Sequence, residues 1–170
     1  TRGKHLNAGL YQQWIDAGVL QTTPGPVTDE RFIQRQIVED ASAMRIIDGN
    51  IDRQFQGMRL AQELEDEGIT LAACGQGFAS MGASTKKCLD LILARRLHHG
   101  GHPILRWMAD NVVLRVDAAG NRKVDKAQSA QKVDGIVALV MALDRLERHT
   151  VAEPSVYLER GVISLSDYLP

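Results

Sequence analysis

The chain has 170 residues, of which 44% are hydrophobic and 24% charged, and its formal net charge is −1. This composition fits one folded domain with a core, and it argues against a globally basic nucleic-acid binder while leaving room for local basic patches. No apolar stretch approaches the roughly 20 residues of a membrane-spanning helix, so no membrane association is expected. The two cysteines, Cys74 and Cys88, are too few for a zinc site and are expected to be reduced core thiols.

Two helices are predicted at the start of the chain. In "GLYQQWIDAGV" the apolar residues recur at helical spacing, and Gly18 suits the position just past a helix end. The segment "QTTPGPVT" predicts a loop because two prolines flank a glycine. Thr28 is then expected to cap a second helix that ends near Glu39.

A strand, a helix and a second strand are predicted next. The segment "AMRIIDGNID" is short and apolar and indicates a strand that ends near Asp52. A helix follows, in which Phe55, Met58, Ala61 and Leu64 are spaced by three residues, and "ITLAAC" indicates the second strand. Strands that alternate with helices predict an α/β layer architecture.

The second half of the chain predicts further helices around one strand. "GQGFASMGAS" is expected to be a loop before a helix in "TKKCLDLILARR", and "ILRWMADN" a short helix. "VVLRVDAAGNRKVDK" predicts a strand, a Gly-Asn turn and a polar loop. Residues 134–148 predict the last long helix, although the apolar run within them is also compatible with a buried strand. Residues 151–170 are interpreted as a C-terminal tail or arm.

Two acids stand beside apolar segments. Asp52 ends a predicted strand, where α/β sheets bind ligands, and Asp134 opens the last helix. Simpler roles exist for each, because Asp favours turns and because a helix start favours negative charge. If the two acids meet, their oxygens suit hard divalent cations such as Mg²⁺, and two such ions together can cleave a phosphodiester. Sequence spacing alone does not decide whether they meet.

The ordered segments of the chain resemble the nuclease domain of tailed-phage large terminase subunits. The resemblance runs from Tyr11 to about Arg148 and lies in the whole ordered set, since no single segment is specific. The matching segments are "YQQWIDAGVLQTTPG", "VTDERFIQRQIVED", "IDRQFQGMRLAQELEDEGI", "GQGFASMGASTKKCLDLILARRLHHGGHPILRWMADNV" and "GNRKVDKAQSAQKVDGIVALVMAL".

This resemblance implies a fold and an activity. The implied fold is an RNase H-like mixed sheet flanked by helices over residues 1–150, N-terminally incomplete, because the family's first-strand acid has no match here. The implied activity is metal-dependent cleavage of double-stranded DNA during genome packaging, with a two-metal site of Mg²⁺ or Mn²⁺. Asp52 and Asp134 match the family's acids and are the expected catalytic metal ligands, with Asp48 as the alternative to Asp52. The resemblance also implies as partners a portal protein, a small terminase subunit and the ATPase domain of the same large subunit, all in the host bacterial cytoplasm.

Several cationic and polar side chains are candidates for DNA contact. Arg122, Lys123, Lys126 and Lys132 precede Asp134 and are expected either to contact phosphates or to be solvated. The histidines of "RLHHGGHP" lack a further motif for zinc and are expected to be exposed near DNA. Under the resemblance, the polar residues Gln76 and Ser80 would line the cleft, and otherwise they are polar surface.

Two other functions remain open on the sequence. The chain could be a catalytically incomplete remnant that binds DNA or docks on a portal or small terminase subunit. It could also be the core of another RNase H-like enzyme, such as a resolvase or transposase. The sequence contains no G-x-x-x-x-G-K-[ST] loop, so it carries no P-loop ATPase of its own.

Overall fold

The computed structural model describes residues 7–53 and 57–148. Over these residues the chain forms six helices and four short strands. In chain order they are α1 (Ala8–Asp16), α2 (Glu30–Ala43), β1 (Gly49–Asp52), α3 (Gly57–Glu65), β2 (Leu71–Cys74), α4 (Phe78–Leu93), α5 (Pro103–Asp110), β3 (Leu114–Val116), β4 (Arg122–Val124) and α6 (Asp134–Arg148). None of these helices has both the length and the apolar character needed to cross a bilayer.

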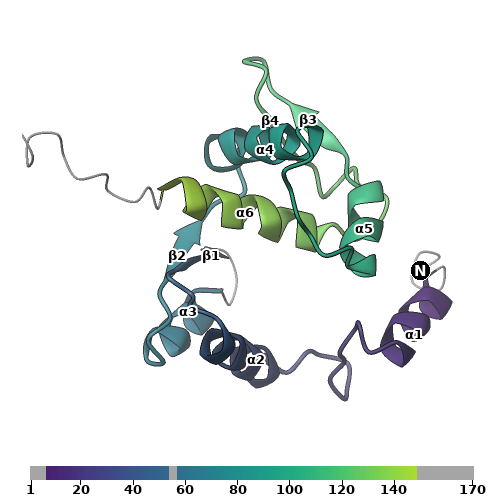
Figure 1. The fold of residues 1–170 in the computed structure, drawn as a ribbon, viewed down its shortest axis with the longest axis vertical. Helices are drawn as coiled ribbons and strands as arrows, with labels where there is room; N and C mark the ends of the chain where they lie inside the picture. Colours follow the sequence, from purple (N-terminus) through teal and green to yellow (C-terminus); the bar gives the residue numbers. More distant parts are fainter. Residues whose placement is uncertain (1–6, 54–56, 149–170) are drawn as a thin grey trace, which may run out of the picture.

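Helix α6 crosses the middle of the molecule, and the other elements lie on its two sides (Figure 1). One side holds α4, α5 and the antiparallel β3–β4 hairpin, and the other holds α2, α3 and the parallel pair β1–β2. The apolar core forms mainly between α6, α4 and the hairpin, and its buried members are Cys74, Met81, Cys88, Val124, Val133, Val137, Val140, Met141 and Leu143. The long apolar run forms a helix rather than a strand, and other elements cover it on two sides.

The β1–α3–β2 unit fixes the end of β1. Its strands pair in parallel with Asp52 opposite Cys74, so both strands end at one edge. Helix α3 begins close to that edge: a Cβ added at Gly57 would collide with the main-chain oxygen of Asp52. Only glycine therefore allows α3 to approach the strand end this closely.

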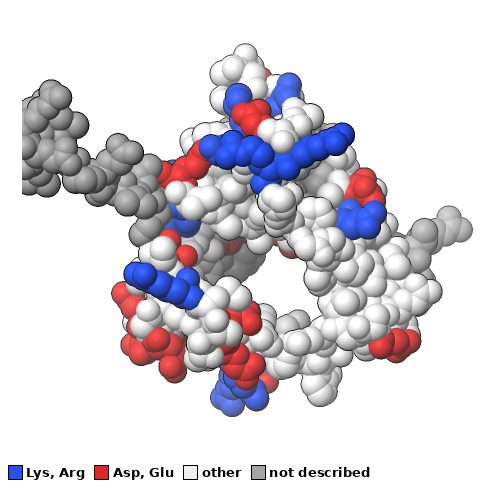
Figure 2. All heavy atoms as spheres, viewed as in Figure 1, with Lys and Arg blue, Asp and Glu red and all other residues white. Residues whose placement is uncertain are grey.

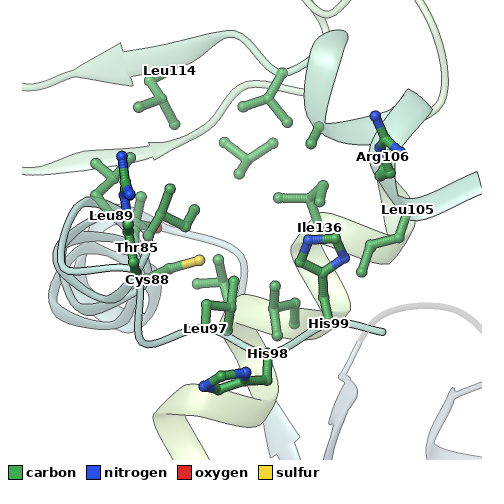
Figure 3. Close-up of a pocket in the computed structure, with 17 residues that line it drawn as sticks. Thr85, Cys88, Leu89, Leu97, His98, His99, Leu105, Arg106, Leu114 and Ile136 are labelled. Carbon is green, nitrogen blue, oxygen red and sulfur yellow. The ribbon is translucent and has the colours of Figure 1, made fainter. Parts of the chain in front are cut away.

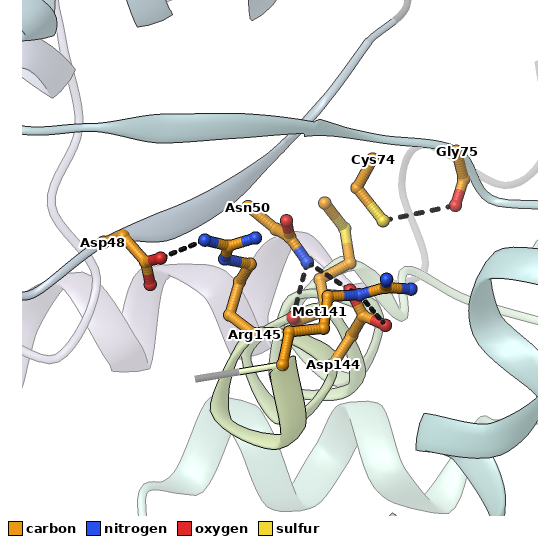
Figure 4. A network of polar contacts seen from close by, with 8 residues as sticks. Asp48, Asn50, Cys74, Gly75, Met141, Asp144 and Arg145 are labelled. Atoms are coloured by element: carbon orange, nitrogen blue, oxygen red, sulfur yellow. Dashed lines mark hydrogen bonds and ion pairs between the residues drawn. The ribbon is translucent and has the colours of Figure 1, made fainter. Parts of the chain in front are cut away.

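A polar network joins β1 to α6 (Figure 4). The Asn50 side-chain amide donates hydrogen bonds to the main-chain oxygen of Met141 (2.9 Å) and to Oδ2 of Asp144 (3.0 Å). Arg148 also donates to Asp144, at 2.9 Å, and Arg145 forms an ion pair with Asp48. The hydrogen bond from Arg148, followed by the one from Asn50, lowers the pKa of Asp144 despite its burial.

Aromatic contacts attach α1 to α5. The Tyr11 and Trp14 rings stack at 5.5 Å, and each meets Trp107 nearly edge to face. The Asn7 amide adds a 2.7 Å hydrogen bond to Gln131. The segment between α1 and α2 runs apart from the rest of the chain (Figure 1). Figure 2 shows an opening through the molecule beside this segment.

Most of the sequence-based elements are confirmed, with four corrections. Thr28 is not the cap of α2, because the Asp29 carboxylate accepts the Arg31 amide at 3.0 Å. Helix α2 continues to Ala43 rather than ending near Glu39. Helix α4 begins at Phe78, inside the expected loop, and the expected polar loop after the Gly-Asn turn contains the strand β4. Phe55 and residues 151–170 lie outside the described residues.

The Gly57 contact generates a stability prediction. Replacing Gly57 with Ala forces a methyl group against the main chain of Asp52, and overpacking of this kind typically costs about 1–3 kcal/mol. We expect Gly57→Ala to lower the free energy of unfolding by that amount in urea denaturation. The matched control is Gly9→Ala in α1, where a Cβ meets nothing within 4 Å. It should leave stability unchanged or slightly raised, and equal effects of the two substitutions would contradict the contact.

The β1–α6 network generates a pH prediction. The pKa of Asp144 is lowered in the folded state, so its stabilising contribution is complete above the carboxyl pKa of the unfolded chain. As pH falls below that value toward the lower folded pKa, the unfolded state takes up the proton first and the contribution is lost. The free energy of unfolding should therefore fall more steeply between pH 5 and pH 3 in the native chain than in Asp144→Asn, measured by urea denaturation. Parallel curves would contradict the assignment.

Candidate functional site

Asp52 and Asp134 line one cavity of about 740 Å³. Asp52 stands at the end of β1 and Asp134 at the start of α6, so the crossing of strand and helix brings them to the same space. Gln76 from the β2–α4 loop and Lys126 from the β4–α6 loop join them in the lining. The remaining wall is largely apolar and comes from the segment before β1 and from α6.

Strand alternation explains why β1 presents polar groups to this cavity. Side chains two residues apart point to the same face of a strand, and Asp48, Asn50 and Asp52 follow that spacing. Asp48 pairs with Arg145 and Asn50 with Asp144, both near the C-terminal end of α6. These contacts hold β1 against α6, and Asp52, the last residue of the strand, lines the same cavity as Asp134.

Asp52 is half-buried and held by Gln76. The Gln76 amide donates a hydrogen bond to Oδ2 of Asp52 at 2.5 Å. Lys123 in turn fixes this loop, because its ammonium donates to the main-chain oxygen of Gln76 at 3.1 Å and lies 5.5 Å from the centroid of the Phe78 ring. Lys123, expected to contact DNA phosphates, therefore also positions the residue that orients Asp52.

Asp134 is paired with Lys126. The Lys126 ammonium lies 2.8 Å from Oδ1 of Asp134, and both side chains stay largely accessible to solvent. This hydrogen bond lowers the pKa of Asp134, opposed by partial burial and assisted by the charges of Lys126 and Lys132. Asp134 is therefore ionised over the whole physiological range. The adjacent Gly135 lets α5 approach, since a Cβ there would lie 2.9 Å from the Met108 sulfur.

The loop that carries Lys126 is shaped by Asp125, a residue that the sequence analysis did not single out. The buried Asp125 carboxylate accepts the main-chain amides of Ala127 (3.0 Å) and Gln128 (3.3 Å). Its main-chain oxygen accepts the Ser129 hydroxyl at 2.7 Å. Asp favours turns because its side chain can accept a main-chain amide two residues on, and this preference could have indicated the bend. The turn fixes the position of the main chain at Lys126.

The remaining residues that the sequence predicted for the site either do not line this cavity or are paired with another side chain. Arg122 is exposed on β4, Lys132 is exposed before α6, and neither lines the cavity of Asp52 and Asp134. Ser80 does not line it either, whereas Asp48 does, in its ion pair with Arg145. Lys and Arg side chains gather in a band over α4 and the hairpin (Figure 2). Within residues 7–53 and 57–148, no three His, Cys, Asp or Glu side chains are grouped as a metal site.

Comparison with known proteins places the chain in a family. The family described as the terminase large subunit, endonuclease domain, matches residues 2–150. The chain belongs to this family. It is 35% identical over 134 residues to the large terminase subunit of Enterobacteria phage HK97, and 31% identical over 140 residues to protein YmfN of Escherichia coli (strain K12). The crystal structure of the HK97 bacteriophage large terminase matches it with a TM-score of 0.75 at 34% identity.

The matches cover most of this chain and a minor part of each relative. The match to the HK97 subunit covers 78% of this chain and 27% of the relative, and the match to YmfN covers 81% and 30%. The match to the solved structure covers 85% of this chain and 30% of that one. The chain thus spans less than a third of the length of these relatives. The predicted terminase nuclease family and the mixed α/β fold are confirmed, and the resolvase or transposase alternative is wrong.

The ion pair at Asp134 generates a prediction. Removing the ammonium in Lys126→Ala should raise the pKa of Asp134 toward its ordinary value, because the hydrogen bond from Lys126 is the main cause of the lowering. Carboxyl ¹³C chemical shifts followed by NMR against pH would measure it. Lys132→Ala is the matched control and should raise this pKa less, since Lys132 acts through charge alone. An unchanged pKa in Lys126→Ala would show that the pair does not form in solution.

Proposed function

We propose that this domain is a metal-dependent endonuclease that cleaves double-stranded DNA during phage genome packaging. The observation that carries the proposal is the position of Asp52 and Asp134 on one cavity in a chain of the terminase endonuclease family. The proposed setting is the host bacterial cytoplasm. The proposed partners are DNA, a portal protein, a small terminase subunit and the ATPase domain of a longer large subunit.

The donor set at the cavity suits a hard divalent cation. Asp52 and Asp134 offer carboxylate oxygens and Gln76 an amide oxygen, and Mg²⁺ and Mn²⁺ prefer such ligands. Asp48 is engaged with Arg145, which makes it a weak rival to Asp52.

A bound divalent cation would supply Lewis-acid stabilisation of the charge that develops on a reacting phosphodiester. The chain's own groups prepare the site for it. The ion pair with Lys126 lowers the pKa of Asp134 and favours its ionised form, and the hydrogen bond from Gln76 orients Asp52. Lys126 can pair either with Asp134 or with a phosphate oxygen, so its ammonium is suited to hold the DNA backbone near the two acids.

DNA binding is proposed to be largely independent of sequence. Arg122, Lys126 and Lys132 are exposed cations on the segment that leads to Asp134, and Lys123 is half-buried beside them. Phosphate contacts of this kind position the duplex and weaken as salt rises. The choice of where to cut would then come from the partners of the domain.

One observation favours the alternative of a non-catalytic docking or DNA-binding module. The described residues provide two carboxylates at the cavity besides the one bound to Arg145, and one of the two is already paired with Lys126. A chain in this state could bind DNA through its basic loop without cutting it. The two functions are separated by nicking activity and by metal binding measured independently.

Plasmid nicking by the 170-residue chain with Mn²⁺ or Mg²⁺ tests the proposal. We expect Asp52→Asn and Asp134→Asn each to lower the nicking rate more than about 100-fold, since changes even outside the direct ligand set cost 10–100-fold. The matched control is Asp66→Asn, an exposed acid away from the cavity, which should nick at the native rate.

Paramagnetic broadening of NMR signals by Mn²⁺ gives a readout apart from activity. Signals of Asp52 and Asp134 should broaden first, and each Asn variant should require more Mn²⁺. Broadening without nicking would favour the docking alternative. Native nicking in both variants would exclude these two acids as the site.

A further inference from the structure

A second cavity, of about 520 Å³, lies on the other side of α6 (Figure 3). It is enclosed by α4, the segment after it, α5, the β3–β4 hairpin and α6. It shares no lining residue with the cavity of Asp52 and Asp134. Its volume is that of a site for a small ligand or a large side chain, in the general range of about 300–1,000 Å³.

The walls of this cavity are apolar except at one point. Leucine, isoleucine and valine side chains form most of them, together with the Cys88 thiol from α4 (Figure 3). The exception is Thr85, which is 2% exposed. Its hydroxyl is one of two buried side-chain polar atoms without a hydrogen-bond partner among the residues that the structure describes. A buried hydroxyl without a partner is costly, so an occupant that brings one hydrogen-bonding group would recover that loss.

The rim of the cavity is cationic. Arg106 on α5 lines it, and Arg95, His98 and His99 line it from the segment after α4. No Asp or Glu is among the lining residues. The turn that carries the histidines is shaped by left-handed backbone at Arg95 (φ 54°) and at the two glycines that follow His99. Negative groups of an occupant would therefore meet arginines that come from more than one element.

We propose that this cavity binds a peptide segment of a partner protein in which a tyrosine is flanked by aspartate or glutamate. The tyrosine ring fits apolar walls, and its hydroxyl at the far end can pair with Thr85. Arg95 and Arg106 both line the cavity, and acidic residues on either side of the tyrosine would offer each of them a carboxylate. A peptide carries such carboxylates on both sides of the ring, which suits two lining arginines that come from different parts of the chain. The proposal does not depend on nuclease activity.

Titration of the 170-residue chain with the peptide Glu-Asp-Tyr-Glu-Asp tests the proposal. Methyl signals of Thr85, Leu105, Leu114 and Ile136 should shift together in NMR spectra, with a dissociation constant below about 1 mM. The matched peptide with alanine in place of tyrosine should cause no such shifts. Absence of shifts with several millimolar tyrosine peptide would overturn the proposal.

Substitutions at Thr85 and Arg106 distinguish the proposed contacts from nonspecific binding. Thr85→Val keeps the side-chain shape and removes the unpaired hydroxyl. It should weaken the tyrosine peptide about fivefold and leave a phenylalanine peptide unchanged, as expected for one net hydrogen bond. Arg106→Glu should weaken binding at least about tenfold, whereas Arg96→Glu, the same charge change off the cavity, should not. Equal weakening by the two arginine variants would overturn the rim assignment.

A last comparison tests the source of the occupant. The chain ending at Arg148 and the full 170-residue chain should bind the peptide equally well. If only the shortened chain bound it, residues 149–170 would be the occupant and the partner in trans would be excluded. Plasmid nicking should be the same in Thr85→Val as in the native chain, so failure of this proposal leaves the nuclease proposal unaffected.

Discussion

The burial of α6 on two sides is the constraint on which the rest of this structure depends. Val140 faces the cavity beside α4 and the hairpin, whereas Val137 and Met141 face the cavity beside β1. A helix with apolar residues around so much of its circumference is stable only when layers cover both sides. Because both cavities take a wall from this helix, a rotation of α6 would alter them together, and the packing that stabilises the fold also sets the geometry of both candidate sites.

Directional contacts fix how far β1 is shifted along α6. Apolar surfaces tolerate sliding, whereas the Asn50 amide must meet a particular main-chain oxygen, that of Met141. Asp52 lies two residues after Asn50, on the same face of the strand. The hydrogen bond that sets the register of Asn50 thereby sets the position of Asp52 relative to the start of the helix. A contact with Met141 in α6 thus helps to fix the position of Asp52 in the cavity that it shares with Asp134.

Most of the helices and strands and the two candidate acids could be predicted from the sequence. That the two acids share a cavity could not. The bounds of α6 and the strand end at Asp52 follow from local apolar patterns, which act within a few residues. That Asp52 and Asp134 share a cavity depends on the crossing of β1 over α6, which no spacing encodes. The start of α4 was missed because its small and polar residues are typical of loops. There they allow close packing: Ser84 is buried, and a Cβ at Gly82 would lie 3.3 Å from Asn121.

The acids of the β1–α6 region differ in what their partners do for the molecule. Asp48 and Asp144 each have 11% of the side chain exposed, and their arginine partners come from the same helix end. The pair of Asp48 with Arg145, whose side chain is 24% exposed, is the more buried of the two and is costly to break, whereas Arg148 is 61% exposed. Asp134 has 59% of its side chain exposed, and an exposed pair with Lys126 contributes little to stability. The contribution of Asp134 to stability therefore comes less from this ion pair than from its place in the first turn of α6, where negative charge is favoured.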